Sequence, residues 1–148
     1  MREIKFRAKR LDNGEWIYGD YHKRAGGEHC IIKMEPDENG KVVYVVHQVA
    51  PDTIGQFTGL HDKNGEEIYE GDILRGFKYP FYDAEADAYN YYAVVDWDAD
   101  EAQFYAYKDL ARGTQVRGIS CGVCVDMEDL REMEVIGNIY DNLGLLKA

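Results

Sequence analysis

The sequence predicts a soluble protein of the mainly β class. Hydrophobic residues make up 45% of the 148 residues and aromatic residues 13%, which is more than a disordered chain carries. Apolar residues occupy every second position in several short segments, the period of a strand with one buried face. Turn signals such as Asn13-Gly14 and Asn64-Gly65 separate these segments. Together these features predict a series of short strands joined into hairpins.

The first predicted strand is Met1 to Arg10. Ile4, Phe6 and Ala8 alternate with charged residues, so one face is expected to be buried and the other solvated. The solvated face is mostly basic. This face either contacts an acidic partner or pairs with the acidic remainder of the protein, and its candidate residues are Arg2, Lys5, Arg7 and Lys9.

Three further strands are expected before residue 50. A turn at Asp12 to Gly14 leads into a strand at Trp16 to Tyr21, which forms a hairpin with the first. A second hairpin combines His29 to Met34 with Lys41 to Val49, across a turn at Pro36 to Gly40.

The central stretch, Thr53 to Arg75, combines the clearest local signals. A strand ending at Leu60 leads into Asp62-Lys63-Asn64-Gly65, where Asp suits the first turn position and Gly65 supplies a positive φ. Ile68 and Tyr69 are expected to begin the return strand of this hairpin. A second turn at Glu70-Gly71-Asp72 follows, and the Asp72 carboxylate is expected to accept backbone N–H bonds there.

The rest of the chain is predicted to hold five strands, enough for a small closed barrel. Lys78 to Asn90 is read as a long aromatic and acidic loop, and the short helical candidates are Met127 to Met133 and Asn142 to Ala148. The five strands are Asp72 to Phe77, Tyr91 to Trp97, Gln103 to Lys108, Thr114 to Ile119 and Val135 to Tyr140.

Four separated motifs in one order resemble the YopX family of phage and prophage proteins. They are Met1 to Ala8, Thr53 to Leu60, Asp62 to Leu74 and Val135 to Asn142. The resemblance implies a fold of β-strands with a small SH3-like barrel, a phage or prophage origin, and no defined activity. We therefore expect an N-terminal β subdomain at residues 1–60 and an SH3-like barrel at 61–148, or one intertwined domain.

The net charge of −11 is unevenly distributed. Residues 1–33 carry +3 and residues 34–148 carry −14. Such a surface repels phosphate backbones at long range, which disfavours general nucleic-acid binding. No apolar run reaches the roughly 20 residues of a membrane span, and no signal peptide is recognised, so the cytoplasm of a bacterial host is expected.

No catalytic, cofactor-binding or metal-binding residue is predicted. Cys121 and Cys124 have the spacing of a zinc or redox pair, but the further ligands Cys30 and His29 are adjacent to each other in another predicted hairpin. Asp96 to Asp100 begins like a calcium loop, yet Glu101 stands where that loop needs Gly, and a hairpin turn explains the acids better. Gly118 to Gly122 matches a nucleophile elbow, without the α/β pattern or downstream His that such a site requires.

Three functional hypotheses follow. A non-enzymatic interaction module that binds another protein or itself agrees best with the absent catalytic constellation. A nucleic-acid role is the alternative, either through the basic first strand or through acidic mimicry of DNA by Asp83 to Glu101. A small enzyme is the third. The expected interface lies on exposed aromatic residues, namely Tyr79, Phe81, Tyr82, Tyr89, Tyr91 and Tyr92.

Overall fold

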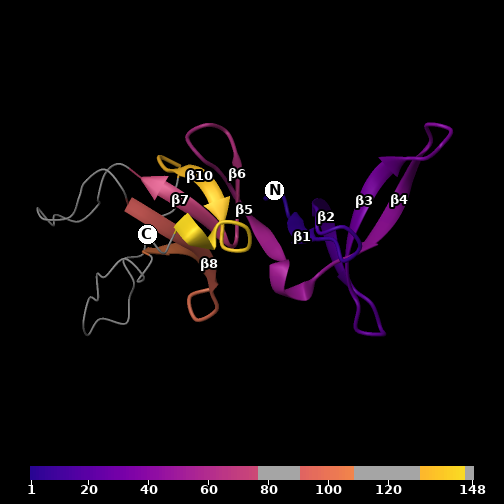
Figure 1. The fold of residues 1–148 in the computed structure, drawn as a ribbon, viewed down its shortest axis with the longest axis horizontal. Helices are drawn as coiled ribbons and strands as arrows, with labels where there is room; N and C mark the ends of the chain where they lie inside the picture. The colour runs from indigo at the N-terminus through magenta and orange to yellow at the C-terminus, as the bar shows by residue number, and fades with distance from the viewer. Residues whose placement is uncertain (77–90, 109–130, 146–148) are drawn as a thin grey trace, which may run out of the picture. The chain divides into compact units, whose positions relative to one another are not determined.

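The computed structural model describes residues 1–76, 91–108 and 131–145. The chain divides into two compact units, Met1–Gly59 and Leu60–Ala148, each described here by itself. In both units the described residues form antiparallel sheets with only single 3-10 turns between or after the strands (Figure 1). The prediction of a mainly β fold is confirmed.

In the first unit β1 to β4 form an antiparallel meander, and β5 returns to pair with β1. The strand order is β4-β3-β2-β1-β5, with β4 at one end of the sheet and β6 (Glu67–Tyr69) following β5 at the other. A 3-10 turn, η1 (Pro51–Thr53), connects β4 to β5. The strands are β1 (Phe6–Lys9), β2 (Trp16–Lys23), β3 (His29–Pro36), β4 (Val42–Gln48) and β5 (Gly55–His61).

The core of the first unit lies on one face of these strands. Ala8, Ile17, Ile31 and Val49 are its buried members, and half-buried Phe6, Tyr21 and Ile54 pack against them. Ile4, expected in this core, is 61% exposed because the strand begins only at Phe6. Arg7, expected in water, is 6% exposed. The solvated face predicted for the first strand is therefore wrong at Arg7.

The second unit begins inside a strand. Leu60 and His61, the last residues of β5, belong to it, and β6 (Glu67–Tyr69) lies beside them across the Asp62–Gly65 turn. This turn closes with the Gly65 N–H on the Asp62 carbonyl oxygen at 3.0 Å, and Gly65 has a φ of +84°. A positive φ is unfavourable for residues with a Cβ, which explains the glycine.

Four strands form the main sheet of the second unit. They are β10 (Glu134–Asn138), β7 (Asp72–Gly76), β8 (Tyr91–Asp98) and β9 (Gln103–Lys108), in that spatial order. The described strands form an open sheet. The strand predicted at Thr114 to Ile119 and most of the helix predicted at Met127 to Met133 lie outside the described residues. Of the second predicted helix, Asn142 to Ala148, the described part holds a 3-10 turn, η3 (Leu143–Leu145), and residues 146–148 lie outside the described residues.

Both faces of this sheet are covered by side chains. Ile73 and Val94, paired across β7 and β8, belong to one apolar cluster, whereas their neighbours Leu74, Ala93 and Val95 belong to the other. Successive residues of a strand point to opposite faces. The continuous apolar runs in β7 and β8 are therefore explained by burial on both sides.

Local turn chemistry agrees with the sequence in two places. The Asp72 carboxylate accepts the Tyr69 N–H at 2.8 Å, as expected. The acidic segment before residue 102 is a hairpin turn, in which Oδ1 of Asp98 accepts the N–H groups of Asp100 and Glu101 at 2.9 and 3.1 Å. The hairpin interpretation of this segment is confirmed.

Candidate functional site

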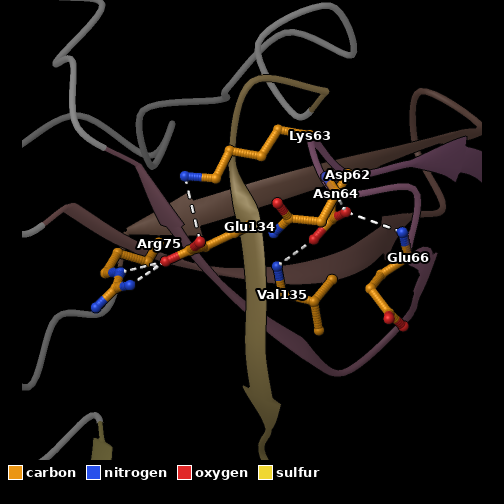
Figure 2. Close-up of polar contacts among 7 residues, drawn as sticks. All are labelled: Asp62, Lys63, Asn64, Glu66, Arg75, Glu134 and Val135. Carbon is orange, nitrogen blue, oxygen red and sulfur yellow. Dashed lines mark hydrogen bonds and ion pairs between the residues drawn. The ribbon is translucent and has the colours of Figure 1, made fainter.

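A buried carboxylate, Asp62, connects the β5–β6 turn to the last strand of the sheet. Its Oδ1 accepts the N–H groups of Asn64 and Glu66 at 2.7 and 2.9 Å, which fixes the turn. Its Oδ2 accepts the Val135 N–H at 2.9 Å, from 73 positions further along the chain (Figure 2). Asp62 thus stabilises its own turn and the position of β10 together.

Glu134, next to Val135, makes ion pairs in the same place. Its carboxylate accepts a hydrogen bond from Nε of Arg75 at 2.7 Å and a second from the Arg75 guanidinium, and it lies 3.2 Å from the Lys63 ammonium. Figure 2 shows the Lys63 and Arg75 side chains meeting it from two sides. Asp62, Lys63, Arg75 and Glu134 are called the polar clasp below.

The charges of the polar clasp lower the pKa of one of its groups, the Glu134 carboxyl. Hydrogen bonds from Arg75 and then from Lys63 hold the pKa of the Glu134 carboxyl below its ordinary value of 4.5. Both carboxylates of the clasp accept hydrogen bonds or ion pairs from several donors. Its chemistry is that of a structural tie between a hairpin and a distant strand.

The stability of the chain is expected to depend on Glu134 in a pH-dependent way. Because its pKa is lowered in the folded protein, its stabilising effect is complete above pH 4.5 and is lost as the pH falls through the folded pKa. The melting temperature of Glu134→Gln should lie below that of the wild type at pH 7 and approach it near pH 3. Glu132→Gln, at an exposed neighbour, should follow the wild-type curve at both pH values. A difference for Glu134→Gln that is constant with pH would contradict the assignment.

The basic candidates of the first strand do not form a freely solvated face. The Arg7 guanidinium lies 4.8 Å and the Lys9 ammonium 5.5 Å from the Trp16 ring centre, and the Lys5 ammonium lies 5.3 Å from that of Phe57. Cations over aromatic faces are held by the ring quadrupole. Arg2 is exposed and precedes β1. Much of this basic charge therefore has an internal, structural partner.

The aromatic interface candidates fall mostly outside the structure. Tyr79, Phe81, Tyr82 and Tyr89 lie outside the described residues. Tyr91 and Tyr92 belong to β8, and half-buried Tyr92 packs on the Ile73 and Val94 cluster. The remaining candidates stay a prediction.

A different exposed apolar surface lies on the β3–β4 hairpin. Met34 is 58% exposed, Val42 57%, Tyr44 72% and Val46 43%. Cross-strand pairing places Met34 opposite Tyr44, and Val42 and Val46 follow on the same face of β4. These four residues are called the apolar strip. Sequence reasoning missed it, although the run Val42 to Val46 was a signal of strong β propensity.

The family model described as YopX protein matches residues 5–147, nearly the whole chain. The chain belongs to the YopX family.

One solved structure is similar to this YopX-family chain over almost its whole length. The crystal structure of protein EF1440 from Enterococcus faecalis is similar, with a TM-score of 0.53 and 22% identity over 99% of both chains. At this identity the likeness shows the fold alone. The comparison with curated proteins found no match.

Two of the four motifs that resemble the YopX family lie on the parts that the polar clasp joins. Asp62 to Leu74 contains the clasp turn, β6 and the start of β7, and Val135 to Asn142 contains most of β10 and the turn after it. Glu134 and Arg75, which sequence reasoning missed, flank these two motifs directly. These two motifs therefore lie on the scaffold of the second unit.

The thiol and metal candidates are only partly described in this YopX chain. Cys30 is buried in β3, whereas Cys121 and Cys124 lie outside the described residues. His29 Nδ1 lies 2.8 Å from the Tyr21 hydroxyl. Among residues 1–76, 91–108 and 131–145, no three His, Cys, Asp or Glu side chains gather as metal ligands. None of the helices in these ranges is long and apolar enough to cross a bilayer.

Proposed function

We propose that this YopX-family protein is a phage or prophage accessory protein that acts in the bacterial cytoplasm as a non-enzymatic interaction module and associates with itself. The proposal includes the SH3-like closure of the second unit, whose expected fifth strand, Thr114 to Ile119, lies outside the described residues. The apolar strip on the β3–β4 hairpin of the first unit is proposed to be covered in part by a second copy of the chain.

The apolar strip is the observation that carries this proposal. Its four side chains are 43% to 72% exposed, and they lie side by side on two neighbouring strands. Contiguous apolar patches are uncommon on monomeric soluble proteins and mark interaction sites when they occur. Tyr and Met are also enriched at protein interfaces. A second copy seated beside this strip would shield part of it from water.

Electrostatics support a protein partner over nucleic acid. The chain carries a net charge of −11, and the buried Arg7 guanidinium lies over Trp16 inside the first unit. Phosphate binding requires cations that are exposed and numerous on one face. The first strand does not present such a face, because Arg7 is buried and the Lys5 and Lys9 ammonium groups lie over aromatic rings.

Light scattering behind a sizing column tests the proposal. At tens of micromolar, the expected mass is about twice the chain mass of 17.0 kDa or more, and it should persist in 0.5 M salt because apolar contacts are not screened. A mass of 17.0 kDa at every concentration would refute self-association. Tyr44→Asp and Phe81→Asp then distinguish the apolar strip from the aromatic segment, since only the variant at the true interface should reduce the mass.

A further inference from the structure

The outermost strand of the first unit, β4, lacks the usual protection of a sheet edge. Within the described residues no strand lies beyond it in the sheet order. Natural edge strands carry lysine, proline or a bulge that prevents pairing with another chain. From Val42 to Val46 the sequence is Val-Val-Tyr-Val-Val, and the β3–β4 register is regular throughout. This edge is therefore chemically prepared to accept another strand.

The hydrogen-bond pattern identifies which residues face outward. The Asp37 N–H donates to the Lys41 carbonyl oxygen at 2.8 Å, and in an antiparallel ladder such hydrogen-bonded pairs alternate with non-bonded ones. Val43 and Val45 consequently bond to β3, while Val42, Tyr44 and Val46 direct their N–H and C=O groups to the open edge.

One backbone hydrogen bond supports this assignment independently. The next outward residue, Gln48, accepts the Leu11 N–H on its carbonyl oxygen at 3.0 Å. The outer edge of β4 is thus already used at Gln48, and the part still available to a new strand is Val42 to Val46.

Symmetry then selects one register for a second copy. An antiparallel partner must pair outward residues with outward residues, and only a two-fold axis at Tyr44 brings all three into pairs. Tyr44 then lies opposite Tyr44 of the second copy, and Val42 lies opposite Val46. Because these residues share a face, the apolar strips of the two copies become one continuous surface.

The charges on the opposite face are compatible with this register. Lys41 would lie across from His47 of the second copy, whose ring is 3.4 Å from the Glu35 carboxylate. The exposed Lys41 ammonium adds an opposite charge to that carboxylate. A hollow of about 310 Å³ lies at the end of this edge, lined by Arg10, Leu11, Asp12, Val46, His47 and Gln48.

We propose that two copies of this chain pair antiparallel along β4, with Tyr44 on the two-fold axis, to form one continuous sheet. This inference rests on the proposed self-association and specifies its surface and register. It makes the apolar strip part of the dimer interface.

Disulfide trapping tests the register. In a background with Cys121→Ser and Cys124→Ser, where buried Cys30 is left in place, Tyr44→Cys should form a covalent dimer under mild oxidation. The two Cα atoms would be about 5.5 Å apart, within disulfide range. Val42→Cys alone and Val46→Cys alone should stay uncrosslinked, because each is displaced from its own copy by roughly 14 Å. A mixture of these two variants, one carrying a size tag, should crosslink.

Mass measurements separate failure of the register from failure of the proposed function. Tyr44→Lys should reduce the mass from about twice 17.0 kDa to 17.0 kDa, whereas Tyr18→Lys, on β2, should leave the dimer intact. Circular dichroism of both variants confirms that the fold is kept. A dimer that survives Tyr44→Lys, or that crosslinks equally through Val42→Cys alone, overturns the edge pairing and leaves self-association standing. A monomeric wild type overturns both.

Discussion

Replacing Asp62 with alanine is expected to lower the free energy of unfolding of the second unit by about 3–5 kcal/mol. The Asp62 side chain is buried, at 6% exposure, and its carboxylate accepts three backbone N–H groups. Without it, the Val135 amide loses its acceptor, and β10 loses one of the bonds that hold it. Urea unfolding is followed by Trp97 fluorescence in a Trp16→Phe background. Trp97 is then the only tryptophan of the whole chain, so the signal reports on the second unit alone.

A matched control exists in the first unit. Asp37 occupies the same Asp-x-Asn-Gly turn pattern, and its Oδ1 accepts the N–H groups of Asn39 and Lys41 at 2.9 and 2.8 Å. These two bonds are exposed, and both join Asp37 to residues of its own turn. Asp37→Ala, followed through Trp16 in a Trp97→Phe background, should cost about 1 kcal/mol. Equal losses for the two variants would show that the long-range bond to Val135 contributes nothing.

Gly19→Ala is expected to destabilise the first unit by about 3 kcal/mol through overpacking. A Cβ at this position in β2 would lie 2.2 Å from the carbonyl oxygen of Ile32 and 3.1 Å from Cγ2 of the buried Ile31. The oxygen belongs to the backbone of the neighbouring strand, so it cannot move without breaking the β2–β3 ladder. Urea unfolding monitored by Trp16 gives the size of the loss.

Gly40→Ala isolates the other cost of replacing a glycine. Gly40 has a φ of +79°, and a Cβ there would meet nothing within 4 Å. Its loss should be about 1 kcal/mol, which is the cost of the left-handed conformation alone. A loss for Gly19→Ala no larger than this would mean that the close approach of the β3 backbone is relaxed at little cost.

The sequence allowed the local parts of the fold to be predicted because their causes are local. Asp62 and Gly65 specify one turn within four residues, and the Asp72 carboxylate reaches an amide three positions away. The partner of Asp62 in β10 was not predictable, because the sequence around Val135 does not indicate which carboxylate accepts its N–H group. Tertiary hydrogen bonds of this kind depend on strand order.

Strand order also explains the errors about exposure. Alternation at Arg7 indicates which face it shares with Lys5 and Lys9, but the cover that buries it comes from Trp16 on the neighbouring strand. In the same way, the run from Val42 to Val46 resembles a buried strand, yet Tyr44 is 72% exposed and its cross-strand partner Met34 is 58% exposed on the same face. Hydrophobic periodicity therefore indicates which residues of a strand share a face, but not which other element covers that face.

The pairing of β10 with β7 also sets the order in which the newly made chain can fold. Glu134 and Arg75 are 59 positions apart, whereas β3 and β4 pair across a short turn. Closing the longer loop costs about 2 kcal/mol more in chain entropy. At roughly 5–20 residues per second, a ribosome needs about 3–12 seconds to travel from Arg75 to Glu134. During that interval the edge of β7 that pairs with β10 has no partner, because β10 has not yet been synthesised. A translational pause in this segment would therefore prolong the time in which nascent chains can pair wrongly with one another.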